Sequence, residues 1–150
     1  MLTMSSKASS GRIWIEDETI HYKTPNGGWE LPVSEVRIVG EHTDQSGPAD
    51  DYFFVFLAPS GWYEASFYAE GCDRFLNELG KLLDSKFDCG LVNSTDFNSQ
   101  IMWPPEEKGK ALFDYSPAPR PKGIWARMKH MVLPLMNYSL TDEVKKRMSW

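Results

Sequence analysis

Cysteine is scarce in this chain of 150 residues, which contains only Cys72 and Cys89. Two cysteines cannot form the disulfide framework of a small secreted domain, so we expect both thiols to be reduced. No apolar run approaches the roughly 18 residues of a membrane-spanning helix. Residues 1–10 also lack the apolar stretch of a secretory signal. Together these absences predict a cytoplasmic protein.

The usual signatures of catalysis and metal binding are also missing. The three histidines form no HExxH motif, and no paired CxxC motif is present. His21 and His42 are interpreted as surface or edge histidines. Cys72 falls in a helical apolar stripe, which favours an inert structural thiol over a nucleophile. The sequence therefore predicts no cofactor, no metal and no enzymatic activity, with an enzyme lacking a recognisable motif as the third alternative.

Positive charge is sparse in most of the chain and concentrated at its end. Residues 1–114 contain nine Lys/Arg and nineteen Asp/Glu, a balance of −10, whereas residues 115–150 contain seven and two, a balance of +5. An acidic body argues against nucleic-acid binding, which requires a basic surface. The charge asymmetry instead directs attention to the C-terminal segment.

The most apolar part of the chain lies between residues 51 and 83. Residues 52–57 are apolar at every position, which predicts a central strand buried on both faces. Pro59-Ser60-Gly61 predicts a turn into a second strand at 62–68. The apolar spacing then changes to three and four, typical of an amphipathic helix over 70–84. Its predicted buried positions are Cys72, Phe75, Leu76, Leu79, Leu82 and Leu83.

Shorter strands are expected on both sides of this unit. Residues 12–16 and 19–23 predict a hairpin, and residues 29–31 follow a turn containing Asn-Gly. Residues 35–39 alternate polar and apolar side chains, as a half-buried strand does. The acidic stretch 41–51 is expected to be a surface loop. Beyond the helix, the sequence predicts a strand pair at 91–92 and 97–103.

The sequence divides into four predicted parts. Residues 1–10 are expected to be a disordered leader, 11–115 a single β-plus-helix domain, 116–121 a proline-rich linker, and 122–150 a basic helical extension. Thr141 is predicted to cap a helix in that extension. Its earlier segment is amphipathic, with an apolar stripe opposite cations. The candidate partner- or membrane-binding residues there are Lys122, Trp125, Arg127, Lys129 and His130.

Two stretches resemble the pleckstrin-homology-like (PH-like) superfamily. Residues 29–40 (WELPVSEVRIVG) are similar to a proline-containing entry into an early strand, and residues 61–83 to a last strand and closing helix. The resemblance covers roughly residues 11–84. It implies an α+β fold, with an antiparallel sheet or partly open barrel packed by one amphipathic helix. Lipid-binding members carry cations in the first hairpin loop, where this chain has Glu16-Asp17-Glu18, so no phosphoinositide is expected.

Taken together, these features predict a non-enzymatic interaction or scaffolding module with a protein partner of unknown identity. The alternative is a peripheral membrane protein that binds anionic lipid through the basic amphipathic segment. Docking of that segment on the body is favoured over membrane binding, because Pro134 interrupts it and a kinked helix follows a curved protein surface more readily than a flat bilayer.

Overall fold

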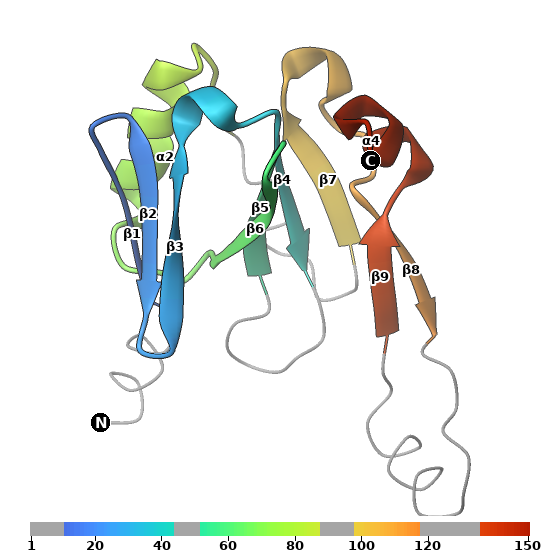
Figure 1. The fold of residues 1–150 in the computed structure, drawn as a ribbon, viewed down its shortest axis with the longest axis horizontal. Coiled ribbons are helices and arrows are strands. Elements are labelled where there is room, and N and C mark those ends of the chain that lie inside the picture. Colours follow the sequence, from blue (N-terminus) through green and yellow to red (C-terminus); the bar gives the residue numbers. More distant parts are fainter. Residues whose placement is uncertain (1–10, 44–51, 88–97, 118–135) are drawn as a thin grey trace, which may run out of the picture.

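The computed structural model describes residues 11–43, 52–87, 98–117 and 136–150 (Figure 1). The fold is α+β, as predicted. Its described strands form three antiparallel sheets and do not close into a barrel. Two α-helices accompany them, α2 (Cys72–Leu82) and α4 (Asp142–Met148). Residues 1–10, the predicted leader, lie outside the described part.

The first sheet is a three-stranded meander. It contains β1 (Arg12–Glu16), β2 (Thr19–Thr24) and β3 (Gly27–Pro32) in that order. The predicted first hairpin is confirmed, with Glu16 paired to Thr19. Asp17 and Glu18 have φ angles of 52° and 54°. Positive φ at both central residues is the geometry that matches the twist of a two-residue hairpin.

The second sheet holds the centre of the molecule. Its order is β6 (Gly61–Ser66), β5 (Tyr52–Ala58), β4 (Ile38–Thr43) and β7 (Asn98–Trp103). β5 and β6 form the predicted aromatic hairpin, in which Leu57 pairs with Trp62. β7 joins the far edge of β4, so the last strand of this sheet comes from a distant part of the chain.

The predicted burial of β5 on both faces is confirmed, because each face packs against a separate core. On one face, Phe54 and Phe56 pack in a core shared by the first sheet and α2. Phe75 and Leu79 are the fully buried positions of that helix. The predicted stripe was wrong at one position: Leu82 is 41% exposed, because it lies at the end of the helix.

The opposite face of the second sheet is covered by the C-terminal part of the chain (Figure 1). β8 (Phe113–Pro117) pairs with β9 (Met136–Leu140), and α4 follows. The side chains of this second core are fully or nearly fully buried. They are Ile38, Val55, Leu57, Ile101, Leu112, Phe113, Leu140 and Val144.

The predicted strand at 35–39 and the predicted surface loop at 41–51 need correction. β4 begins at Ile38 and continues through Thr43, and all six of its residues are buried. Glu41 and His42 therefore lie inside the sheet, not in a solvated loop. The reason is the pairing of β7, which makes β4 an interior strand. The predicted partner of β7, residues 91–92, lies outside the described residues.

The end of the chain is part helix and part strand. Ser116 and Pro117, the first residues of the predicted linker, are the last two residues of β8. The predicted helical extension contains a strand, β9, followed by α4. The predicted cap is confirmed, because Thr141 Oγ1 accepts a hydrogen bond from the Val144 backbone N–H at 3.3 Å. Such a cap satisfies a donor that the first turn leaves free.

Candidate functional site

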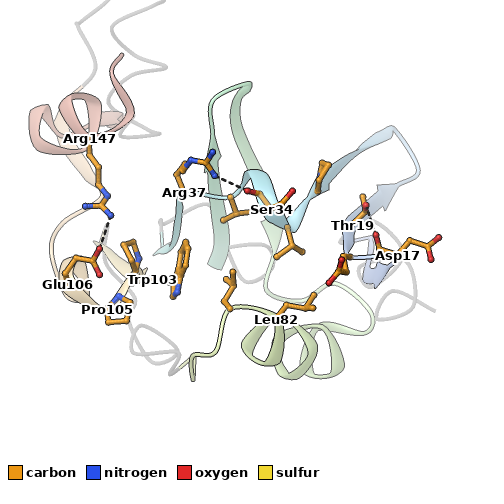
Figure 2. A pocket seen from close by; sticks show the side chains of 15 residues that line it. Asp17, Thr19, Ser34, Arg37, Leu82, Trp103, Pro105, Glu106 and Arg147 are labelled. Carbon is orange, nitrogen blue, oxygen red and sulfur yellow. Dashed lines mark hydrogen bonds and ion pairs between the residues drawn. The ribbon is translucent and has the colours of Figure 1, made fainter.

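A cleft of about 760 Å³ opens between the first sheet and the C-terminal part (Figure 2). That volume lies within the range of ligand-binding pockets. Its walls come from the β1–β2 turn, the 3₁₀ helix η1 (Val33–Glu35), the end of α2, the end of β7 and η2 (Pro105–Glu107). Arg147 of α4 completes the lining. Because the end of β7 and η2 are continuous in sequence, five separate regions of the chain meet at this site.

Several of the residues that line the cleft are apolar. Val33 and Val36 are buried beneath it, and Leu83 and Trp103 are half-buried along it. Leu82 adds exposed apolar surface to the cleft. This residue of the predicted helical stripe therefore faces the cleft and not the core. Pro104 and Pro105 end β7, as the sequence predicts, and they turn the chain into η2.

One end of the cleft carries an ion-pair network that links η2 to α4. Arg147 donates to Glu106 at 3.2 Å and to Glu107 at 3.1 Å, and Lys110 contacts Glu107 at 2.9 Å. The hydrogen bond from Lys110 holds the pKa of Glu107 below its ordinary value, with a further contribution from Arg147. The same hydrogen bond raises the pKa of Lys110. Arg147 is therefore already neutralised.

Other charges of the cleft have no such partners. The guanidinium of Arg37 donates to the backbone carbonyl oxygen of Ser34 at 3.0 Å, and the side chain is exposed. Within the described residues, Arg37 forms no ion pair, nor do the exposed carboxylates of Asp17 and Glu18. Figure 2 shows Asp17 at one end of the cleft and Arg147 with Glu106 at the other, with Arg37 between them. The cleft thus carries unneutralised charge of both signs.

Two of the buried polar residues of the second sheet, Glu41 and His42, carry a carboxyl or an imidazole group and lie outside the cleft. On one face, the Glu41 carboxyl accepts hydrogen bonds from Tyr52 Oη at 2.8 Å and from Gln100 Nε2 at 2.9 Å. On the other, His42 Nε2 lies 2.7 Å from Glu64 Oε1. Phe53 stacks on the His42 ring, and Phe113 meets it edge to face. Glu41 is 0% exposed and His42 1% exposed.

Glutamate and histidine often act in catalysis, but here both side chains are buried away from solvent. A general acid or base must come within hydrogen-bond reach of a substrate, and side chains shielded from solvent offer no such access. Both groups contact side chains of other strands, Glu41 through two hydrogen bonds and His42 through Nε2. Their arrangement therefore fits a structural role, which fixes the register of β4 against β5, β6 and β7.

The interpretation of His42 as a surface or edge histidine was wrong. Glu41-His42-Thr43 has the composition of a loop, and no spacing in the sequence marks it as buried. Cys72, by contrast, lies in the core as predicted. The candidate residues Lys122, Trp125, Arg127, Lys129 and His130 all fall within 118–135, outside the described residues.

No protein-family model, curated protein or solved structure matches the chain. Across the described ranges, His, Cys, Asp and Glu do not gather in threes where they could hold a metal ion. The described helices are also too short to span a membrane. The geometry alone therefore supports the cleft as the candidate site.

Proposed function

We propose that this protein is a non-enzymatic interaction module that binds a protein partner in the cleft. The observation that carries the proposal is the composition of the cleft itself. Its lining combines apolar residues with exposed charges of both signs, a combination that protein-binding surfaces also show. Among the described residues that line the cleft, none is a histidine or cysteine that could act as nucleophile or base.

The module is proposed to be PH-like. The supporting arrangement is a three-stranded antiparallel sheet, followed by β4, β5 and β6 of a second sheet, and then the amphipathic helix α2. The helix packs in the core between the two sheets. β7, β8, β9 and α4 extend this arrangement beyond the region of resemblance, and the end of β7, η2 and α4 supply one wall of the cleft.

Phosphoinositide binding is not part of the proposal. The β1–β2 turn, where lipid-binding members carry cations, holds Asp17 and Glu18 at the mouth of the cleft. Their negative charge would repel a phosphate group. Soluble inositol phosphates are therefore expected to show no binding heat when titrated into the protein.

Site-specific photo-crosslinking tests the proposed function. A photo-reactive amino acid replaces Ser34, an exposed residue of the cleft, in cells that produce the protein. The matched control places it at Asn26, an equally exposed position in the β2–β3 turn. We expect discrete protein adducts from position 34, absent from position 26. Equal labelling at both positions, or no adduct at position 34, would contradict the proposal.

A further inference from the structure

The unneutralised charges of the cleft differ from the rest of its polar lining. Arg147 is held by two carboxylates of η2, and so offers no free charge to a ligand. Arg37 donates to the Ser34 carbonyl oxygen, and no carboxylate among the described residues pairs with its positive charge. Asp17 and Glu18 lie at one end of the cleft, in a turn that exposes both residues to solvent. The cleft is therefore negative at the hairpin and positive at Arg37.

The surface between these charges suits an apolar side chain. Leu82 borders the cleft with 41% of its surface exposed, and the half-buried Trp103 also lines the cleft. Figure 2 shows Leu82 between the Asp17 end and the Trp103–Pro105 side. Covering such surface is favourable at roughly 25 cal/mol per Å². The order of the acidic turn, Leu82 and Arg37 therefore defines a direction along the cleft.

We infer that the cleft binds an extended peptide segment in one orientation. A basic side chain of the partner lies against Asp17 and Glu18, an apolar side chain covers Leu82, and an acidic side chain pairs with Arg37. Charge complementarity selects this order, because the reverse orientation would bring like charges together at both places. The inference rests on the proposed function and specifies the partner's chemistry.

Selection from a library of random 12-residue peptides displayed on phage, with the full chain immobilised, tests the inference. We expect enriched sequences to share a basic, then an apolar, then an acidic position. A synthetic peptide of that sequence is then titrated against charge variants. Arg37→Glu should weaken binding about fivefold or more, the scale of one partly exposed ion pair. The double variant Asp17→Asn/Glu18→Asn should weaken it similarly, since Asn tolerates the positive φ of that turn.

Matched controls separate direct pairing from a general change of charge. Lys81→Glu alters net charge as Arg37→Glu does, at an exposed position of α2 outside the cleft lining. Asp73→Asn/Asp84→Asn matches the acidic double variant, and Asp84 also has a positive φ of 48°. Both controls should change affinity less than twofold. A peptide with its acidic residue changed to Lys should regain affinity for Arg37→Glu, which only direct pairing explains.

The outcomes distinguish the inference from the function beneath it. Cleft-dependent peptides that lack the charge order, or equal effects of Arg37→Glu and Lys81→Glu, would overturn the inference and leave the binding module standing. Ser34→Trp, which fills the cleft, should abolish binding if the cleft is the site. Peptides insensitive to that change, or no enriched peptide at all, would overturn both.

Discussion

Leu79 and Leu82 lie near the end of the same helix in opposite environments. Leu79 is fully buried in the first core, whereas Leu82 borders the cleft. We expect Leu79→Ala to lower the free energy of unfolding by about 2–5 kcal/mol, through lost burial and the cavity left behind. Leu82→Ala should stay within about 0.5 kcal/mol of the parent. Urea unfolding measures both, and a loss below about 1 kcal/mol for Leu79→Ala would contradict the packing of α2.

The hydrogen bond from Tyr52 to the buried carboxyl of Glu41 gives a second prediction about stability. Tyr52→Phe keeps the ring and removes the hydroxyl group that donates to Glu41. An under-satisfied buried polar group costs about 1–3 kcal/mol, and we expect a loss of that size in unfolding experiments. Tyr63→Phe is the control, because within the described part of the chain the Tyr63 hydroxyl group contacts only the exposed Ser60, at 2.8 Å. Equal effects of the two changes would argue against a buried network.

The same residues show what a single sequence could not reveal. Charged and polar side chains are usually solvated, so Glu41 and His42 favoured a loop over a buried strand. Each is compensated by a partner far along the chain, Gln100 for Glu41 and Glu64 for His42. Long-range partners leave no periodic signal near the residue they satisfy. By contrast, the burial of Phe54, Phe75 and Leu79 followed from local periodicity.

At the scale of elements, β4 approaches the C-terminal part most closely at Gly40. A Cβ atom built on Gly40 would lie 2.6 Å from Leu112 Cδ2 and 3.1 Å from the Gln100 carbonyl oxygen. Leu112 is fully buried, so it has little room to move. We expect Gly40→Ala to destabilise the protein by about 1–3 kcal/mol through overpacking. In a Leu112→Ala background the added methyl group has space, so a double-mutant cycle should show a smaller cost there; an unchanged cost would contradict this contact.

The link between η2 and α4 predicts a pH dependence. Because the pKa of Glu107 is lowered in the folded state, its contribution to stability is present above the ordinary Glu pKa of about 4.3 and is lost as pH falls through the folded-state pKa. The raised pKa of Lys110 preserves the pair until well above neutral pH. We expect Glu107→Gln to have a lower urea midpoint than the parent at pH 7. The two midpoints should converge at acid pH.

Glu35→Gln provides the control for this measurement. Glu35 is exposed and forms no ion pair with any described residue. Its replacement should leave the midpoint close to the parent value from neutral to acid pH. A constant difference between Glu107→Gln and the parent across the whole range would show that the substitution acts through packing and not through charge.

Elements with strong local signals were predicted well. The first hairpin followed from alternating strands around a two-residue turn, and the helix α2 from its apolar period of three and four. The cap at Thr141 followed from residue type and position alone. β8 and β9 were missed, because Pro117 suggested a linker and the residues around Met136 continued an apparent helical pattern. Their strand conformation depends on pairing with each other.

At the scale of the whole molecule, docking and membrane binding of the basic segment 122–135 predict different effects on stability and on lipid binding. Docking predicts that Trp125→Ala lowers unfolding free energy by about 3–5 kcal/mol, the cost of truncating a buried aromatic residue. It also predicts that the protein does not co-sediment with anionic liposomes at physiological salt. Unchanged stability with salt-dependent lipid binding would instead favour the peripheral membrane alternative, since each basic residue near such a surface contributes about 1 kcal/mol.

The cleft is a property of the whole molecule and could not be predicted as a site. The sequence indicated several of its parts, including the acidic Asp17-Glu18 turn and the prolines that end β7. Their proximity to Arg37 depends on how the first sheet, α2 and the C-terminal part pack together. Single-sequence patterns describe neighbours along an element, whereas this cleft joins residues from Asp17 to Arg147.

The pairing of β4 with β7 has a consequence for the order in which a newly synthesised chain can fold. On a ribosome, β1 through α2 emerge first and can form the first core. Until Asn98 emerges and pairs with Thr43, β4 has an open edge. At that stage Val55 and Leu57 are not yet covered by the C-terminal residues of the second core. An open edge beside apolar surface is a site of intermolecular aggregation. We therefore expect nascent chains stalled after α2 to recruit chaperones, and full-length chains to release them.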